Sequence, residues 1–451
     1  MERNPFVRRP RTASVTVVGI DDTDSREAGM CTTYAAALLA ERLRDRGDAV
    51  HRVCLVRLNP AVEYKTRGNA ALAIHTDAPV DAAFAAARAL VDDRAVVGDP
   101  RTNPGVVALD AAPDAVPEQV ATFAGRAVRE VLARERVRDL LADLDATGTV
   151  EARRGTWGDG RGLVGALAAV GAWRAWHATG LTPTYERLVY RPRERCGTGR
   201  DVDVESVFAA DRASPTVWDT VDRGEGEAVC VPHTPGPVLY GIRGDDPAAC
   251  RRVAAAIDAE PAERARTFVT NQGTDAHLRD GTLPTARDGR AYRLDGVVTS
   301  TPETRRGGHV FFDLRGHDGD TDDPATLACA AFEPTKRFRD RVRDLRVGDR
   351  VTVCGEGGEG TLKLEKFAVR DLARTERVTP DCPACGRSMS SAGRGQGYRC
   401  RDCGTTAPGK VEREVPRTLE PGWYEVPPCA RRHIAKPLVR GGFDAPTHPE
   451  R

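Results

Sequence analysis

Residues 15–34 read VTVVGIDDTDSREAGMCTTY, and this stretch decides the fold of the N-terminal region. The apolar run at 15–20 predicts a β-strand. Apolar residues then recur at four-residue spacing over 30–46, which predicts a helix that stops at Gly47. A second apolar run at 51–58 completes a strand–helix–strand unit, for which we expect parallel pairing.

Three carboxylates, Asp21, Asp22 and Asp24, follow the first strand, at the edge of a parallel sheet where ligands bind. Because like charges repel, a cation is the simplest way to stabilise them, and oxygen ligands favour magnesium. Residues 29–33 open the helix, whose free N–H groups and dipole attract an anion. Together these features predict a nucleotide triphosphate. The alternative is an acidic turn that only caps the helix.

Two further loops carry cations. Residues 64–69 read YKTRGN, and the charges of Lys65 and Arg67 are suited to neutralising a phosphate during transfer, although a solvated loop is the alternative. Residues 158–166 read GDGRGLVGA, with Arg161 among glycines at the start of a helix. This loop resembles a phosphate cradle only loosely, because the Walker lysine is missing.

The pattern changes twice further along the chain. A strand at 70–75 and a helix at 80–91 complete the first α/β region, and a second α/β region spans roughly 156–283. The second region predicts a split strand–helix–strand sandwich. Its expected elements are a helix at 163–178, strands at 228–231 and 238–242, a helix at 247–259 and a strand at 266–270.

Short alternating strands begin near residue 291. Five of them before a zinc ribbon predict a Greek-key barrel of the OB type, a common nucleic-acid reader. Residues 332–339 read FEPTKRFR and interleave Phe338 with Lys336 and Arg337, a pattern that stacks bases and contacts phosphates. A core position for the phenylalanines is the alternative. The expected strands lie at 292–298, 309–314, 326–331, 349–354 and 362–369.

Cys382, Cys385, Cys400 and Cys403 form two Cys-x-x-Cys knuckles, the most specific short motif in the chain. This spacing predicts a zinc ribbon, and four protein ligands leave no coordination position open for chemistry. The zinc is therefore structural. The segment between the knuckles is too polar to bury a core unaided, and its exposed arginines, Arg394 among them, suit a polyanion.

Residues 404–451 are rich in Pro and Arg with few apolar positions, so we expect a tail or docking arm. Its basic segment suits RNA contact, with a solvated tail as the alternative. Cys429 and His433 have ligand-like spacing, but the four cysteines already saturate one zinc. The expected RNA contacts here are Arg431, Arg432, His433 and Lys436.

Length and composition limit the number of domains and the class of protein. A chain of 451 residues is expected to hold three or four domains. The net charge of +1 neither demands nor excludes nucleic acid, although only six of the 67 basic residues are lysines. Arginine grips phosphate bidentately, but a GC-rich genome explains the bias equally well. No apolar run approaches membrane length and no hydrophobic signal region is evident, so we expect a cytoplasmic protein with reduced thiols.

Taken in order, these motifs resemble the archaeal agmatinylcytidine synthetases, which modify the wobble cytidine of an isoleucine tRNA anticodon. The resemblance covers nearly the whole chain. It rests on GIDDTDS at 19–25, GMCTTY at 29–34, RLNP at 57–60, YKTRGN at 64–69, GRGLVGALAA at 160–169, PVLYGIRG at 237–244, AFEPTK at 331–336, SAGRGQG at 391–397 and VPPCARRH at 426–433.

The resemblance implies an ATP-dependent ligase with magnesium and structural zinc. It phosphorylates a cytosine carbonyl oxygen and displaces the phosphate with the amine of agmatine, on an isoleucine tRNA with a CAU anticodon. No membrane and no obligate protein partner are expected. The implied domains are a kinase-like domain at 13–155, a ferredoxin-like domain at 156–286, an OB fold at 287–376, a zinc ribbon at 377–410 and a basic tail at 411–451.

The same resemblance implies residue roles. Asp21, Asp22 and Asp24 would align the triphosphate, with magnesium on the first two, and Lys65 and Arg67 would steady its charge. Thr32 would be the site of autophosphorylation. Further ATP contacts would be Gly29, Thr33, Gly160, Arg161 and Gly162. The Arg-rich residues before the first strand depart from the family pattern.

Two other classes of function remain open from the sequence. A non-enzymatic RNA-binding protein would need no magnesium and turn over no nucleotide, and the acidic strand end argues against it. An ATP-dependent enzyme for a small molecule would not be stimulated by RNA, and the zinc ribbon with its basic segment argues against that.

Overall fold

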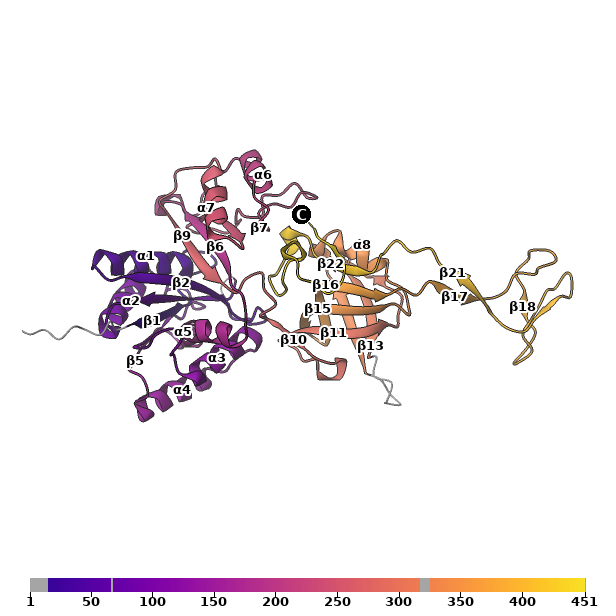
Figure 1. Cartoon of the computed structure of the whole chain (residues 1–451), viewed down its shortest axis with the longest axis horizontal. Coiled ribbons are helices and arrows are strands. Elements are labelled where there is room, and N and C mark those ends of the chain that lie inside the picture. Colours follow the sequence, from indigo (N-terminus) through magenta and orange to yellow (C-terminus); the bar gives the residue numbers. More distant parts are fainter. Residues whose placement is uncertain (1–14, 66–67, 317–324, 451) are drawn as a thin grey trace, which may run out of the picture.

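The structure, a computed structural model, describes residues 15–65, 68–316 and 325–450. Figure 1 shows two halves side by side, an α/β half built from the first part of the chain and an all-β half built from the rest. A thin two-stranded arm extends from the all-β half and carries a small domain at its end.

The α/β half is organised on a single nine-stranded sheet, with strand order β5-β4-β1-β3-β2-β9-β6-β8-β7. Its elements are β1 (Thr16–Asp21), α1 (Thr32–Asp45), β2 (Val50–Arg57), β3 (Ala70–Thr76), α2 (Val80–Arg94), β4 (Gly105–Leu109), α3 (Glu118–Arg129), α4 (Arg134–Thr147), β5 (Ala152–Thr156), α5 (Gly162–Ala178), β6 (Thr184–Tyr190), α6 (Val204–Arg212), β7 (Val217–Trp218), β8 (Val238–Gly244), α7 (Pro247–Ala256) and β9 (Arg264–Thr270).

The expected strand–helix–strand unit forms, but its parallel pairing is wrong. β3 lies between β1 and β2 and pairs antiparallel with both. On its other edge β2 pairs in parallel with β9, where Cys54 lies opposite Val269. The two α/β regions therefore share one sheet, because a strand from each supplies the backbone partners at the boundary.

Helices cover both faces of the first part of this sheet. α1 and α2 pack on one face and α3, α4 and α5 on the other, each with its own apolar core. α5 approaches β1 very closely, because a Cβ on Gly19 would lie 2.0 Å from the carbonyl oxygen of Ala166. Only glycine fits there, so this residue sets the distance between helix and sheet.

The second α/β region follows its predicted pattern in part. The helices α5 and α7 and the strands β8 and β9 are confirmed. The strand expected at 228–231 is wrong, since these residues lie in turns and make isolated backbone hydrogen bonds before Pro232. A proline at that point removes a donor that a ladder would need. β6 and α6 were not predicted.

The all-β half is built on a closed five-stranded barrel, with neighbours in the order β11-β13-β14-β16-β15 and back to β11. All five expected strands are confirmed. Every pairing within the barrel is antiparallel except that of β14 with β16. The elements are β10 (Leu278–Asp280), β11 (Ala291–Val298), β12 (Glu303–Thr304), β13 (Val310–Arg315), β14 (Thr326–Ala331), α8 (Phe338–Arg343), β15 (Arg350–Gly358) and β16 (Thr361–Asp371).

Phe338 does not face RNA, so its predicted stacking role is wrong. It is fully buried at the first position of α8 and packs against Phe367 in the barrel core, with ring centroids 5.6 Å apart. The side chain enters the core because α8 turns Phe338 and Val342 to the same side.

The arm consists of β17 (Thr375–Val378) paired with β21 (Val411–Glu414), and it carries β18 (Ser390–Ser391), β19 (Tyr398–Arg399) and β20 (Thr406–Ala407). Both arm strands are largely exposed. Their base is fixed by Arg417, whose two terminal nitrogens each lie 2.6 Å from an oxygen of buried Asp349. The barrel therefore holds the arm through a bidentate ion pair.

Of the two expectations for the last segment, a loose tail is wrong, and the segment instead docks on the barrel. β22 (Gly422–Glu425) extends the barrel sheet beside β16, and β23 (Thr447–His448) pairs with β22. Few residues here are apolar, but Trp423, Tyr424 and Leu438 are all buried. A small number of large side chains thus anchors a segment whose overall composition is polar.

The predicted RNA contact of Arg431 is also wrong. Its guanidinium is 2% exposed and lies 2.9 Å from Asp219 of the α/β half and 2.6 Å from Glu425 of β22. Burial raises the pKa of Asp219, and the positive charge of Arg431 opposes part of that shift. Arg431 therefore joins the two halves of the molecule through buried charge.

We expect Arg431→Met to lower the free energy of unfolding by about 3 kcal/mol or more, because it strands two buried carboxylates without a counter-charge. Denaturant melts would measure the loss. Arg42→Met is the matched control: Arg42 on α1 is partly exposed and pairs with exposed Asp93 at 3.0 Å, so a loss below about 1 kcal/mol is expected. Equal stabilities of the two variants would contradict this role.

Candidate functional site

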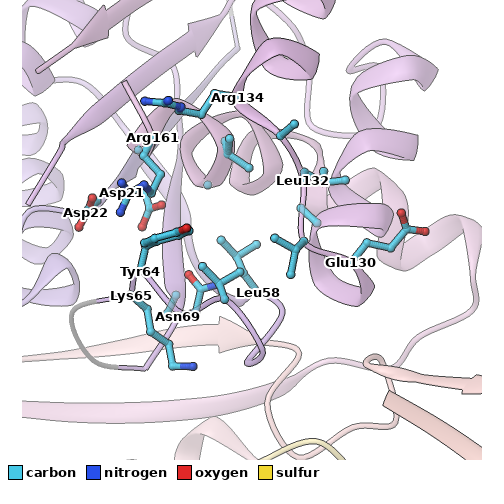
Figure 2. A pocket seen from close by; sticks show the side chains of 18 of the residues that line it. Asp21, Asp22, Leu58, Tyr64, Lys65, Asn69, Glu130, Leu132, Arg134 and Arg161 are labelled. Atoms are coloured by element: carbon cyan, nitrogen blue, oxygen red, sulfur yellow. The ribbon is translucent and has the colours of Figure 1, made fainter. Parts of the chain in front are cut away.

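A cavity of about 590 Å³ opens at the C-terminal end of β1. Asp21, Asp22 and Asp24 lie at one side of it. Figure 2 shows Asp21 and Asp22 close to Arg161, with Leu132 and Glu130 across the cavity. The remaining wall is largely apolar and includes Leu58, Val62, Tyr64, Val131 and Val164. One charged side and one apolar side suit a ligand with phosphates and a flat ring system.

The backbone holds the acidic turn in place. Asp22 adopts a left-handed conformation, with φ of 58°, and its carboxylate accepts a hydrogen bond from the backbone N–H of Asn103 at 2.9 Å. The hydroxyl of Thr102 donates to the Asp24 carbonyl at 2.6 Å. Helix α1 has Cys31 at its N-cap and no side-chain cap bond. The acids therefore do not cap the helix, which removes that alternative.

The carboxylate of Asp21 lies directly against helix α5. A Cβ on Gly165 would come within 1.9 Å of a carboxylate oxygen of Asp21. This glycine is required for the close approach rather than for its backbone conformation. Its role was not predicted from the sequence, where it appeared only as one of several glycines near Arg161.

Burial raises the pKa values of Asp21 and Asp22. The pKa of Asp21 is raised well above its ordinary value, first by burial and then by the neighbouring charges of Asp22 and Asp24. Burial likewise raises the pKa of Asp22 to about 7, and the charge of Asp24 adds to the shift. Both shifts disfavour the ionised form. A bound cation would reverse that preference, so the pair fits a hard divalent ion such as magnesium.

The glycine loop at 158–162 is ordered by Asn103, a residue that sequence reasoning missed. The Asn103 side chain accepts from the N–H of Asp159 and its carbonyl accepts from the N–H of Gly162, both at 2.9 Å. Asn103 thus holds both the loop and Asp22. Asn103 is buried. In the sequence, the one signal that could have pointed to this residue was the Asn–Pro step just before a strand.

Arg161 is held at the mouth of the cavity. Its guanidinium lies 2.7 Å from Asp159, which also pairs with Arg134 at 3.1 Å. The same guanidinium stacks over the ring of Tyr64, 4.5 Å from the ring centroid. Of the residues predicted to contact ATP in this loop, Arg161 and Gly162 line the cavity, whereas Gly160 does not.

The remaining predicted phosphate contacts are less direct. Lys65 lines the cavity, but its ammonium group bonds the carbonyl of Pro60, and Figure 2 shows it directed away from the acids. Burial lowers the pKa of Lys65. Arg67 lies outside the described residues.

The N-terminus of α1 faces a second cavity, of about 210 Å³. Thr32 and Thr33 line it, and the Thr32 hydroxyl accepts from that of Thr23 at 3.1 Å. Gly29 is buried against the backbone of Pro235 and lines neither cavity. The two cavities share lining residues Asp24, Gly68 and Ala70, so they adjoin.

Charge in the second cavity is mixed. Its lining brings together Arg57, Arg200 and Arg243 with Glu186. Glu186 is buried and lies 3.1 Å from Arg243 and 3.5 Å from Arg57. The three arginines and the N-terminus of α1 together make this recess suited to an anionic group.

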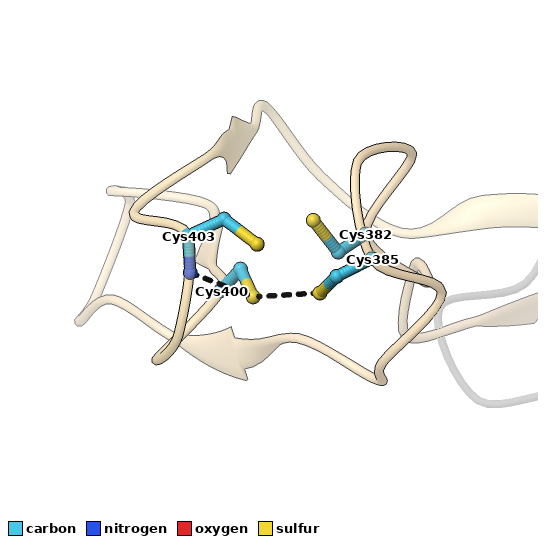
Figure 3. Close-up of side chains that lie close together, drawn as sticks. All are labelled: Cys382, Cys385, Cys400 and Cys403. Atoms are coloured by element: carbon cyan, nitrogen blue, oxygen red, sulfur yellow. Dashed lines mark hydrogen bonds between the residues drawn. The ribbon is translucent and has the colours of Figure 1, made fainter.

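The four cysteines meet at the end of the arm. Figure 3 shows their sulfur atoms facing one another, and all lie within 4.8 Å. In the part of the chain that the structure describes, no other group of three or more His, Cys, Asp or Glu side chains is so close. The knuckles are therefore arranged for one tetrahedral zinc.

The predicted RNA contacts divide into exposed and engaged residues. Arg394 of the ribbon is exposed. Arg337 pairs with Asp222 at 3.0 Å and Glu450 at 2.6 Å, and Lys336 lies 3.7 Å from Glu225. These pairs tie the barrel to the α/β half. His433 and Lys436 are half-buried in the same seam.

Comparison with known proteins identifies the family. Profiles described as the TiaS TCKD domain, the TiaS FLD domain and the TiaS C-terminal zinc ribbon domain match residues 17–79, 160–277 and 379–419. An isoleucine-tRNA 2-agmatinylcytidine synthetase TiaS of Haloquadratum walsbyi is 52% identical, covering 97% of this chain and 100% of its own. The chain belongs to the TiaS family. The Methanosarcina mazei member is 46% identical, over 94% and 97%.

Solved TiaS structures agree with this assignment. A complex of TiaS with its isoleucine tRNA and ATP is 40% identical, with a TM-score of 0.83, and covers 97% of this chain and 100% of its own. A complex of TiaS with the same tRNA, AMPCPP and agmatine is 37% identical, with a TM-score of 0.80 and the same coverage. No helix within the described residues is long and apolar enough to cross a membrane.

We expect Asp22→Asn to stabilise the protein when no magnesium is added. Because the folded pKa of Asp22 is about 7 and its ordinary value is 3.8, the carboxylate destabilises the fold increasingly as pH rises through this window. The variant should match the parent at pH 4 and exceed it by about 1–3 kcal/mol at pH 8.

Thermal melts across this pH range would measure the difference. Asp139→Asn, on the exposed face of α4, is the control and should change little at any pH. A loss of stability for Asp22→Asn that does not vary with pH would contradict the assignment.

Proposed function

We propose that this chain joins agmatine to the wobble cytidine of an isoleucine tRNA in an ATP-dependent reaction. The observation that carries the proposal is the acid-lined cavity at the end of β1, in a chain that aligns with named TiaS proteins over almost its whole length. The solved TiaS complexes with tRNA, ATP or its analogue, and agmatine support the same substrates.

The chemistry requires activation of the base. The cytosine carbonyl oxygen is a poor leaving group, so ATP first transfers a phosphoryl group to it. The amine of agmatine, after losing a proton, then attacks the same carbon, and inorganic phosphate leaves with the oxygen. The C–O bond is replaced by a C–N bond, which is the change that a ligase must make.

Asp21 and Asp22 are the proposed magnesium ligands, since burial and mutual repulsion make both poorly stable as free anions. When bound, the ion neutralises charge on the phosphates. Asp24 would align the triphosphate from between the two cavities. Arg161 would contact phosphate at the mouth, as would Lys65 after a change of side-chain direction; Arg67 is a further proposed contact.

The apolar wall would take the adenine ring, with Tyr64 and Leu132 on opposite sides. The cationic recess beside it, with Thr32 at its edge, is the proposed place for the transferred phosphoryl group, and Thr32 the proposed autophosphorylation site. Gly29, Thr33, Gly160 and Gly162 would shape these loops.

We also propose the finer domain assignment. The strand order and the single parallel pairing of the barrel support an OB fold over 287–376. The kinase-like domain would span 13–155, the ferredoxin-like domain 156–286, the zinc ribbon with its structural ion 377–410 and the final barrel-bound segment 411–451. Arg394, Arg432, Lys336, Arg337, His433 and Lys436 remain proposed tRNA contacts.

Neither other class of function is favoured. A protein that only binds RNA would have no use for a cavity in which buried acids gather beside an apolar wall. An enzyme for a small molecule alone would not need a zinc ribbon on a projecting arm. The named relatives are synthetases, and their solved complexes contain tRNA.

The proposal is tested with a transcript of the isoleucine tRNA that carries the CAU anticodon, together with ATP, magnesium and labelled agmatine. We expect label in the RNA with the parent chain and a loss of at least about 100-fold with Asp21→Ala, because a metal ligand is removed. The affinity for tRNA should stay within about twofold, since RNA contacts lie elsewhere. Incorporation by Asp21→Ala at the parental rate would refute the magnesium assignment.

A glycine pair gives an independent prediction. We expect Gly165→Ala to reduce incorporation by at least about 100-fold, because the new methyl group must displace the Asp21 carboxylate. In Gly98→Ala, in the exposed loop after α2, a Cβ would meet no atom within 4 Å, so activity should be unchanged and stability equal or higher. Full activity in Gly165→Ala would mean that Asp21 needs no fixed position.

A further inference from the structure

Three arginines converge on one carboxylate at the end of α3, and a fourth lies beside them. Glu130 lies 3.1 Å from Arg126 and 3.8 Å from Arg290, and it also accepts a hydrogen bond from Arg279. Arg129 is the fourth member of this arginine patch, and its Nε donates to the carbonyl of Ala276 at 2.8 Å. The patch is therefore built from a helix, β10 and the loop before β11.

Arg129 differs from the other three. Among the described residues, no carboxylate lies within ion-pair distance of its guanidinium, although the group is half-buried. Burial and the neighbouring charge of Arg279 both lower the pKa of Arg129, and the charge of Asp280, which is itself paired with Arg293, opposes them. Its positive charge is thus held in place by the fold without a negative partner of its own.

The patch carries an excess of positive charge. Glu130 is the one acid among the four arginines, and nearby Asp280 is already bound to Arg293 at 2.7 Å. Arg126, Arg129 and Arg279 line a recess of about 290 Å³ beside Trp176. Like charges gathered this closely are costly unless an anion binds among them.

The position of the patch points to the kind of anion. Glu130 lines both this recess and the nucleotide cavity, so the two adjoin. Arg279 and Arg290 lie at the seam where the α/β half meets the barrel, near β10 in Figure 1. Arg129 does not line the nucleotide cavity, so its charge is available to a second substrate.

We propose that the arginine patch binds a backbone phosphate of the substrate tRNA and so positions the reacting nucleotide at the cavity. This inference rests on the proposed function. A guanidinium fork matches the geometry of a phosphodiester, and a contact on the wall next to the cavity restrains the neighbouring base. Arg129 is a positioning residue, since it touches the RNA backbone and not the reacting atoms.

The test uses the salt dependence of binding, which counts phosphate contacts. We expect Arg129→Gln to weaken the binding of the isoleucine tRNA transcript about tenfold near 0.1 M KCl. The slope of log Kd against log salt should fall by about 0.7–0.9, the value for one contact. Arg129→Lys should keep the parental slope, because it keeps the charge but loses the forked geometry.

Kinetics separate positioning from chemistry. In Arg129→Gln the KM for tRNA should rise about tenfold, while the KM for ATP and the kcat at saturating tRNA stay within about twofold. Arg88→Gln is the matched control, an exposed arginine on α2 with its own acidic neighbour Asp92, and it should change neither affinity nor slope.

Opposite results would overturn the inference. An unchanged slope in Arg129→Gln, or a raised KM for ATP with unchanged RNA binding, would exclude a phosphate contact. If Arg129→Gln fails to fold, the more exposed Arg290→Gln must show the same loss of slope. If the parent chain itself does not bind the transcript, the proposed function fails, and this outcome is distinct from failure of the patch alone.

Discussion

The site depends on how closely helix α5 can approach strand β1. Gly19 lets the Ala166 carbonyl lie against the strand, and Gly165 leaves room for the carboxylate of Asp21. At the start of the helix, Gly105 and Gly162 meet at backbone distance. Because none of these glycines carries a Cβ, the helix can lie deep enough to form one wall of the cavity, and the acids are enclosed rather than exposed.

The shared sheet explains why two cavities adjoin. β2 and β9 pair in parallel across the boundary between the α/β regions, so Arg57 at the end of β2 comes beside Glu186 and Arg243 of the second region. A rigid sheet fixes this distance better than a linker could. The proposed sites of the triphosphate and of the transferred phosphoryl group are then held at constant separation.

Local sequence patterns predicted many of the helices and strands, but contacts between residues far apart in the chain determined the partners of these elements. The apolar run at 15–20, the acids after it and the cysteine knuckles each carry their own signal, and all were found from the sequence. The insertion of β3 between β1 and β2 depends on backbone partners that no periodicity encodes. The buried position of the Arg431 side chain likewise depends on Asp219, a residue 212 positions away in the chain. For this reason Arg431 was predicted to meet RNA and instead meets buried acid.

The excess of arginine over lysine has a structural explanation as well as a compositional one. Buried Arg191 and Arg417 each make a forked pair of bonds to one carboxylate, and buried Arg431 bridges two carboxylates, all at 2.6–2.9 Å. A compact ammonium cannot bond two oxygens in one plane in this way, so lysine would leave part of each carboxylate unpaired. These three buried arginines are therefore each held by at least two bonds to carboxylates. Arg129, half-buried without an ion pair among the described residues, departs from this pattern, and beside three other arginines and a recess it forms a surface suited to a phosphate.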